Sequence, residues 1–257
     1  MPGQGRLGVV VALAVAAVLA RPAAAETLVE TSAETRLQLD FAVSDAAVHK
    51  VLPPGWDTDV ATSGGAKDCN LRMIFIDRID VNGPDGAPKG TSQLVIIEVP
   101  VKKPGSELAG RMIIDGVTAD PKDAPGPFGV YHGAVAYRME RSTVAVPGGP
   151  IQGVESWAFT AANGEHMELH LKYERGVARK GGGEVKFFSG KNPGFYQIGK
   201  IAQGLDPMRN ATVPTRDRVS EFDYEATGGY LGSLFDGTQR VVSIDAIHWH
   251  NRAVYLP

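Results

Sequence analysis

The chain has few of the features that mark several common protein classes. Cys69 is the only cysteine among 257 residues, so no disulfide can form within one chain. The formal net charge is −3 and the pI is about 6.1, which argues against the basic surface of a nucleic-acid-binding protein. Hydrophobic residues make up 43% of the chain, too many for a disordered protein of low net charge. We therefore expect a folded protein without a nucleic-acid partner.

The first 25 residues have the pattern of a secretory signal peptide. Arg6 precedes an apolar run over residues 7–19, and Ala23-Ala24-Ala25 forms an A-x-A cleavage site. The run is 13 residues long, whereas a membrane-spanning helix needs about 20. We predict cleavage after Ala25, a periplasmic or extracellular protein, and no stable membrane anchor. Residues 26–257 show no change of composition and are expected to form a single domain.

Most of the remaining chain has the pattern of β-strands. Polar and apolar residues alternate over residues 35–43, the period of a half-buried strand. Further strands are expected over residues 71–81, 92–101, 110–118, 130–141, 151–161, 165–174, 184–189, 217–226 and 239–249. No regular alternation of strands and helices is present, which excludes a doubly wound fold. The prediction is a mainly β protein with a single antiparallel β-barrel.

Helices and turns are expected at a few places between these strands. Ser44 precedes a short N-terminal helix over 45–52, which Pro53-Pro54-Gly55 ends. A second, weaker helical pattern covers residues 194–203. Asn163-Gly164 predicts a hairpin turn. The three glycines at 181–183 are expected to form a loop.

Two short segments resemble the acetoacetate decarboxylase-like superfamily. Residues 44–56, Ser-Asp-Ala-Ala-Val-His-Lys-Val-Leu-Pro-Pro-Gly-Trp, resemble the short helix and Leu-Pro-x-Gly turn that precede the strands of that family's barrel. Residues 96–101, Ile-Ile-Glu-Val-Pro-Val, resemble a family strand that ends in Pro-Val. The resemblance implies a barrel with a central cavity for a small molecule.

The chain departs from this family at the expected catalytic positions. The decarboxylase has a Schiff-base lysine in a Gly-Phe-Pro-Lys-Lys motif, which aligns best with residues 129–133. That segment reads Gly-Val-Tyr-His-Gly and has no lysine. The family's substrate-orienting glutamate would lie near Gln93 or Leu94, and it too is absent. On this alignment the resemblance implies no Schiff-base chemistry, with His132 at the position of the nucleophile.

Candidate site residues follow from this alignment and from strand parity. His132 is predicted to be a general acid or base, because a neutral imidazole can donate or accept a proton near pH 7. Glu98 and Glu155 share strand faces with apolar residues, where burial would raise a carboxyl pKa, and are the other candidate catalytic groups. Five further residues are expected to bind the ligand: Gln93, Tyr131, Trp157, His248 and His250.

Histidines on two strands raise the alternative of a metal site. His166, Glu168 and His170 alternate along one strand and share a face. His248 and His250 are expected to share a face of the last strand, continuing an apolar stripe. We favour a solvated face for the first set and expect no metal and no cofactor, since parity alone does not bring the two sets together.

The sequence leaves the choice between enzyme and binding protein open. The leading hypothesis is a secreted barrel that binds a small carbonyl-bearing or apolar molecule, with a lyase-type activity that needs no Schiff base. One alternative is a non-catalytic, lipocalin-like carrier of a hydrophobic ligand. Others are a metal-dependent enzyme that uses the strand histidines, and a structural surface protein. The oligomeric state and the ligand's identity are not predicted.

Overall fold

The computed structural model describes residues 25–210, 217–229 and 231–257. Apart from Ala25, the expected signal peptide lies outside these residues. The described part is mainly β, as predicted, with two short α-helices and one 3-10 helix. None of the described helices has the length and apolar character needed to cross a membrane.

Twelve strands and three short helices follow one another along the chain. Their bounds are β1 (Thr27–Ala42), α1 (Asp45–Val51), β2 (Asp57–Thr58), β3 (Leu71–Asn82), β4 (Pro88–Lys102), β5 (Ala109–Thr118), η1 (Pro121–Asp123), β6 (Tyr131–Val144), β7 (Gln152–Ala161), β8 (His166–Glu174), β9 (Arg179–Ser189), β10 (Tyr196–Asn210), β11 (Val219–Thr227), α2 (Leu231–Leu234) and β12 (Arg240–Leu256). The predicted short helix corresponds to α1, which follows β1, so the described chain begins with a strand.

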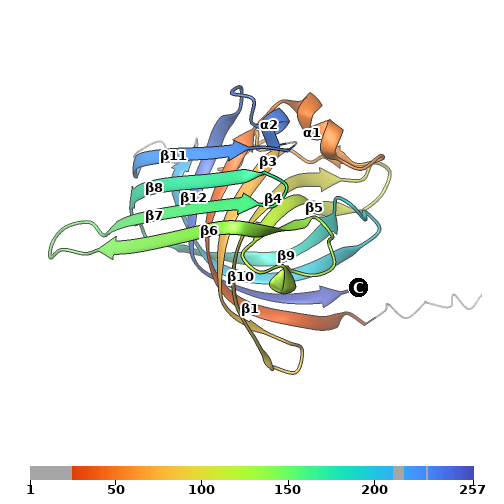
Figure 1. Ribbon diagram of the computed structural model, residues 1–257, viewed down its shortest axis with the longest axis horizontal. Helices are drawn as coiled ribbons and strands as arrows, with labels where there is room; N and C mark the ends of the chain where they lie inside the picture. Colours follow the sequence, from red (N-terminus) through yellow and green to blue (C-terminus); the bar gives the residue numbers. More distant parts are fainter. Residues whose placement is uncertain (1–24, 211–216, 230) are drawn as a thin grey trace, which may run out of the picture.

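All twelve strands belong to one sheet, in the order β11-β8-β7-β6-β5-β9-β10-β12-β1-β3-β4-β2. An additional pairing joins β4 to β5. Hydrogen-bonded neighbours therefore lead from β4 through β5, β9, β10, β12, β1 and β3 back to β4, and we call these seven strands the ring. Strands β6, β7, β8 and β11 extend the sheet as a second layer beside the ring (Figure 1). Two of the pairings, β5–β6 and β5–β9, are parallel, whereas the prediction was an antiparallel sheet.

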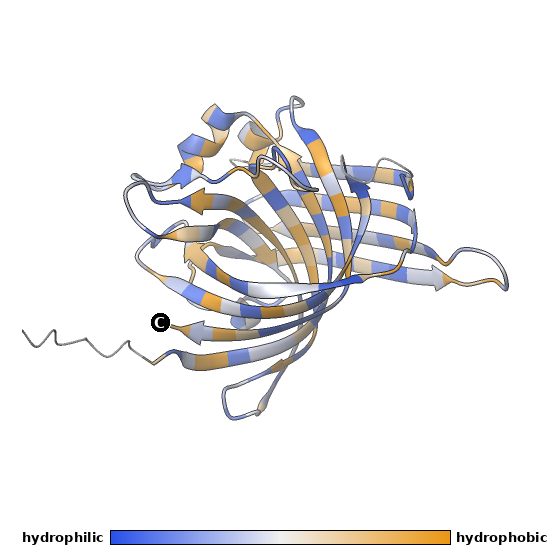
Figure 2. Cartoon of the chain, turned by 180° about the vertical axis from the view of Figure 1, so that it is seen from behind, coloured by the Kyte–Doolittle hydropathy of each residue, from blue (hydrophilic) through white to orange (hydrophobic). Residues whose placement is uncertain are grey.

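The ring strands carry different residues on their two faces because side chains alternate along a strand. On β1, Leu37, Leu39 and Phe41 point to a large apolar cluster, which we call the outer core. It lies between the ring and the second layer, with side chains from β3, β4, β7, β8, α1 and α2. The opposite face of β1 carries Arg36 and Asp40, and Figure 2 shows this alternation along the curved strands. Both faces of β1 are buried, whereas its alternating pattern predicts one buried face and one face exposed to solvent.

Two local predictions are wrong. Residues 196–203 of the predicted helix 194–203 form the start of β10, because Gly199 and its neighbours pair with β9 and β12 on either side. Tertiary pairing thus overrides a weak helical pattern. The glycines at 181–183 belong to β9. Gly182 has φ +147°, and a Cβ there would lie 2.1 Å from the Ile201 carbonyl oxygen, so the close approach of β10 requires glycine.

The inner face of the ring holds an unusually large number of charges for a protein interior. Asp245 on β12 is one of them: it is 6% exposed and accepts a hydrogen bond from Ser243 Oγ at 3.0 Å. Burial, reinforced by the negative charge of Asp40, raises the pKa of Asp245 from 3.8 to about 7. The folded state therefore retains a proton on this carboxyl group at a pH where the unfolded state has lost it.

Asp245→Asn should flatten part of the pH dependence of stability. Between about pH 4 and pH 7 the folded state binds one proton more than the unfolded state, so the wild type loses stability as pH rises. A pKa difference of one corresponds to about 1.4 kcal/mol, so the rise from 3.8 to about 7 predicts a variant that is more stable by up to about 4 kcal/mol at neutral pH and equal in stability at pH 4. Urea denaturation at several pH values checks this. Asp223→Asn, at an exposed position on β11, is the control. If Asp245→Asn is less stable than the wild type at neutral pH, the prediction is wrong.

Candidate functional site

A cavity of about 260 Å³ lies within the ring, and we call it the ring cavity. Every one of the seven ring strands contributes to its wall. The described lining residues are Arg36, Gln38, Arg72, Ile74, Glu98, Arg111, Gly182, Gly183, Glu184, Val185, Phe187, Ile201, Gln203, Ile247 and His250. Two glycines in β9 leave room where side chains would otherwise fill the wall. A volume below the 300–1,000 Å³ of drug-sized ligand sites suits a molecule of a few atoms.

Three arginines give the ring cavity its chemical character. Arg72 is held by both carboxylate oxygens of Asp40, at 2.6 and 3.1 Å. Arg36 donates to Glu34 Oε2 from Nε at 2.7 Å and from Nη2 at 2.5 Å. These partners fix both guanidinium groups against the strands.

Arg111 differs from the other two because it keeps free donors. The single ion pair of its side chain is with Glu98, at 3.5 Å, and this side chain forms no hydrogen bond within the described part of the chain. Its side chain is 32% exposed. Burial lowers the pKa of Arg111, with the positive charge of Arg72 adding to this effect. A guanidinium with unused planar donors in a small cavity is suited to bind a carboxylate.

Two of the predicted residues, Glu98 and His250, do lie in the ring cavity. Glu98 is 3% exposed and pairs with Arg72 at 3.4 Å as well as with Arg111. His250 Nδ1 lies 2.9 Å from Gln203 Oε1, so Nδ1 carries the proton and donates. Burial, together with the nearby charge of Arg36, lowers the pKa of His250 far below its usual range and keeps the ring neutral. Its Nε2 then has a lone pair, with no hydrogen-bond partner among the described residues.

Tyr131 faces the same interior but does not line the ring cavity. Its ring packs edge-on against Phe128 with centroids 6.4 Å apart, in the apolar cluster beside the cavity. Burial raises the pKa of Tyr131, so the hydroxyl stays protonated, and it has no hydrogen-bond partner among the described residues. Because side chains alternate, the inward residue of this strand is Tyr131, and His132 points to the other face.

Glu155, Trp157 and Gln93 lie away from the ring cavity. Glu155 accepts hydrogen bonds from Arg141 at 3.0 Å, Trp157 Nε1 at 3.2 Å and the Tyr173 hydroxyl at 3.2 Å. Trp157 is 1% exposed in the outer core. Gln93 donates to Asp77 at 3.0 Å. These contacts show what holds the three side chains in place.

His248 and His250 do not share a face, contrary to the prediction. A β-bulge in β12 shifts the register. Ile247 pairs with Arg36 and His250 pairs with Glu34, so β12 has one extra residue between Ile247 and His250, and the alternation of faces is broken there. His248 Nε2 lies 3.2 Å from Asp206 Oδ2. It lines a smaller hollow of about 170 Å³ that Glu155 also borders.

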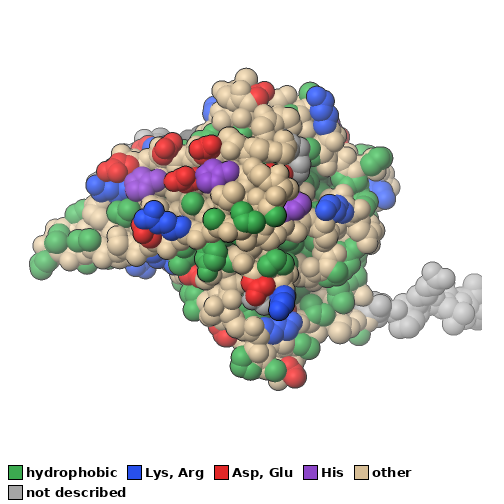
Figure 3. Space-filling view, viewed as in Figure 1, with side chains coloured by type: hydrophobic (Ala, Val, Ile, Leu, Met, Phe, Trp, Pro, Cys, Tyr) green, Lys and Arg blue, Asp and Glu red, His purple; other side chains and the backbone are tan. Residues whose placement is uncertain are grey.

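The histidines of β8 lie on the outside of the second layer. His166 Nε2 is 3.4 Å from Glu168, and His170 Nε2 is 3.5 Å from Glu221 on β11. Figure 3 shows histidine and acidic side chains gathered over these two strands. This is the solvated face that we favoured. Among the described residues these histidines form no cluster with His248 or His250 that could hold a metal.

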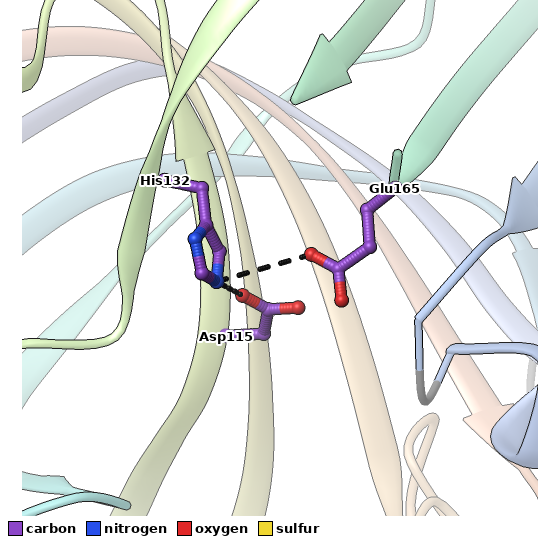
Figure 4. Close-up of side chains that lie close together, drawn as sticks. All are labelled: Asp115, His132 and Glu165. Atoms are coloured by element: carbon purple, nitrogen blue, oxygen red, sulfur yellow. Dashed lines mark ion pairs between the residues drawn. The ribbon is translucent and has the colours of Figure 1, made fainter. Parts of the chain in front are cut away.

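His132 meets two acidic residues that the sequence analysis did not single out. Its Nε2 is 3.5 Å from Asp115 Oδ1 on β5 and 4.0 Å from Glu165 Oε2 in the β7–β8 turn (Figure 4). Asp115 is 1% exposed and Glu165 is 2% exposed. We call these three residues the carboxylate–histidine cluster. A buried aspartate in the apolar sequence Met-Ile-Ile-Asp-Gly-Val was the one available signal.

No protein-family model and no curated protein sequence matches the chain. Solved structures do resemble its fold. The enduracididine biosynthesis enzyme MppR, with HEPES buffer bound, superposes with a TM-score of 0.51 at 11% identity, over 90% of this chain and 86% of that one. The same enzyme complexed with pyruvate gives 0.50 at 12% identity, over 91% and 90%. An acetoacetate decarboxylase-like enzyme from Sphingomonas wittichii RW1 gives 0.51 at 13% identity, over 95% and 99%. The likeness confirms the distant resemblance expected from the sequence, at the level of the fold.

Proposed function

We propose that the chain binds a small carboxylate-bearing molecule, of the size of a 2-oxo acid, inside the ring, and that the ring is a closed β-barrel. The observation that carries the proposal is Arg111, whose donors are unused at the wall of the ring cavity. Ile74, Phe187 and Ile201 supply apolar wall for the rest of the ligand. MppR, which shares the fold, has been solved with pyruvate, a carbonyl-bearing acid of this size.

The proposed activity is a lyase-like reaction without a Schiff base. Among the described residues that line the ring cavity, none is a lysine. His250 is assigned to accept a hydrogen bond from the ligand and not to take up a proton, because its imidazole stays neutral and keeps a lone pair on Nε2 beside the cavity. The charged wall disfavours the alternative of a carrier for hydrophobic cargo, which would require apolar lining.

Arg111→Met should weaken pyruvate binding at least about 10-fold, because hydrogen bonds to a charged group contribute about 1.5–3 kcal/mol. Isothermal titration of wild type and variant with pyruvate measures this, with acetone as a probe that keeps the carbonyl and lacks the carboxylate. Acetone should not bind. Borohydride added with pyruvate should leave the protein mass unchanged.

Arg138→Met is the matched control, since the Arg138 side chain is 69% exposed on β6 and its ion pair among the described residues is with Glu140 on the same strand. It should bind pyruvate as the wild type does. Equal pyruvate affinity in wild type and Arg111→Met would place the ligand elsewhere. A borohydride-trapped adduct would restore Schiff-base chemistry to consideration.

A further inference from the structure

Three metal-ligating side chains converge outside the ring cavity, where β5, β6 and the β7–β8 turn meet (Figure 4). They are the carboxylate–histidine cluster of Asp115, His132 and Glu165. Each offers one ligand atom, and these atoms lie within 4.8 Å of one another. Residues far apart in sequence are thus brought together, and none of the three is among the described residues that line the ring cavity.

Glu165 indicates that this cluster holds more than an ion pair. The residue is 2% exposed, yet its Oε2 has no hydrogen-bond partner among the residues that the structure describes. Oε2 is aimed at His132 Nε2 from 4.0 Å, too far for a hydrogen bond. Leaving a buried carboxylate oxygen without a partner is costly. A positive group between the two side chains would satisfy it.

The charges and donor types favour a divalent metal ion over a proton. A protonated His132 that pairs with Asp115 would leave Glu165 unbalanced. A divalent ion balances both carboxylates and binds imidazole in its neutral form. One imidazole nitrogen with two carboxylate oxygens suits Zn²⁺ and similar transition metals, whereas Mg²⁺ and Ca²⁺ prefer oxygen ligands throughout.

We propose that Asp115, His132 and Glu165 bind a divalent transition-metal ion of the Zn²⁺ class. Ligand atoms about 2.0–2.2 Å from one ion lie at most about 4.4 Å apart, so a small rotation of the side chains closes the site. The His132 side chain is 32% exposed, so solvent reaches the cluster. Three protein ligands leave a fourth position for water or a ligand, as in catalytic zinc sites. This site does not depend on the function proposed for the ring cavity.

Zn²⁺ titration of the chelator-treated protein near neutral pH tests the proposal. The wild type should bind one ion per chain by isothermal titration, and its melting temperature should rise with Zn²⁺. Glu165→Gln and His132→Asn should each lower the Zn²⁺ affinity by at least about 10-fold. The reason is that losing a residue that merely orients a metal ligand already costs about 10- to 100-fold in affinity. Glu165→Gln keeps the side-chain shape, and its circular dichroism should match that of the wild type.

His166→Asn is the matched control, because His166 pairs with Glu168 on the solvated face of β8. It should bind Zn²⁺ as tightly as the wild type. The proposal is overturned if the wild type binds Zn²⁺ no more tightly than Glu165→Gln does. It is also overturned if only His166→Asn loses the ion, which would assign binding to the surface histidines.

Discussion

Replacing Glu34 with glutamine should lower the free energy of unfolding by about 3–5 kcal/mol, the cost of leaving buried charges without their partner. The Glu34 side chain is fully buried on the inner face of the ring. It accepts hydrogen bonds from Ser32 at 2.6 Å and from Arg36, and lies 3.3 Å from Arg252. Without this carboxylate, two buried guanidinium groups lose a negative partner.

The pKa of Glu34 supports the same expectation. Burial alone would raise it, but the charges of Arg36 and Arg252 outweigh burial and hold the pKa well below its usual range. The stabilisation is therefore present above the unfolded-state pKa of about 4.3 and is lost as pH falls towards the folded-state pKa.

Urea denaturation of wild type, Glu34→Gln and Glu140→Gln measures the effect. Glu140 pairs with Arg138 on β6, but its side chain is 60% exposed, so its loss should change stability by less than about 1 kcal/mol. If both substitutions cost the same small amount, the inner charges do not form the coupled network that their distances indicate.

Trp157→Ala should also destabilise the protein by about 3–5 kcal/mol, through the cavity it leaves in the outer core. Trp157 is 1% exposed, packs against Phe75 and Phe159 with centroids 5.9 and 6.4 Å away, and donates to Glu155. From the sequence we predicted that Trp157 binds the ligand. Its surroundings instead predict a loss of stability.

Trp249→Ala provides the matched control, because Trp249 on β12 is 38% exposed. We expect a loss of about 1 kcal/mol there, as for an average point substitution. Thermal and urea unfolding of both variants, with pyruvate titration alongside, separates the two roles. An alanine variant at 157 that stays as stable as the wild type and loses pyruvate binding would return this residue to the binding site.

The strands were predictable because the alternation that defines them is local. Residues 71–81 were predicted as a strand, and β3 covers Leu71–Asn82. The order of strands was not predictable, because it depends on which distant segments pair. Neither the parallel β5–β9 pairing nor the bulge near His248 leaves a local signal. Residues 194–203 show the same limit, since their partners lie in β9 and β12.

The candidate site was predictable only where a polar residue stood out against an apolar pattern. Glu98 follows Ile96-Ile97, and it does line the ring cavity. Arg36 and Arg72 also sit in alternating strands, but alternation alone assigns such residues to a solvated face. A ring turns that face inward, which the sequence of one strand cannot reveal. The signal peptide, the export and the single domain stay predictions.

The pairing of β1 with β12 has a consequence for how the chain is made. Residues 27–42 pair along their length with residues 240–256, so β1 leaves the ribosome about 200 residues before its partner β12. Until then neither β1 nor β10 has its β12 partner, and the ring cannot close. Pairings this distant in sequence slow folding. The ring therefore closes only after β12 has been synthesised, and a chain that lacks β12 would retain two unpaired strand edges open to aggregation.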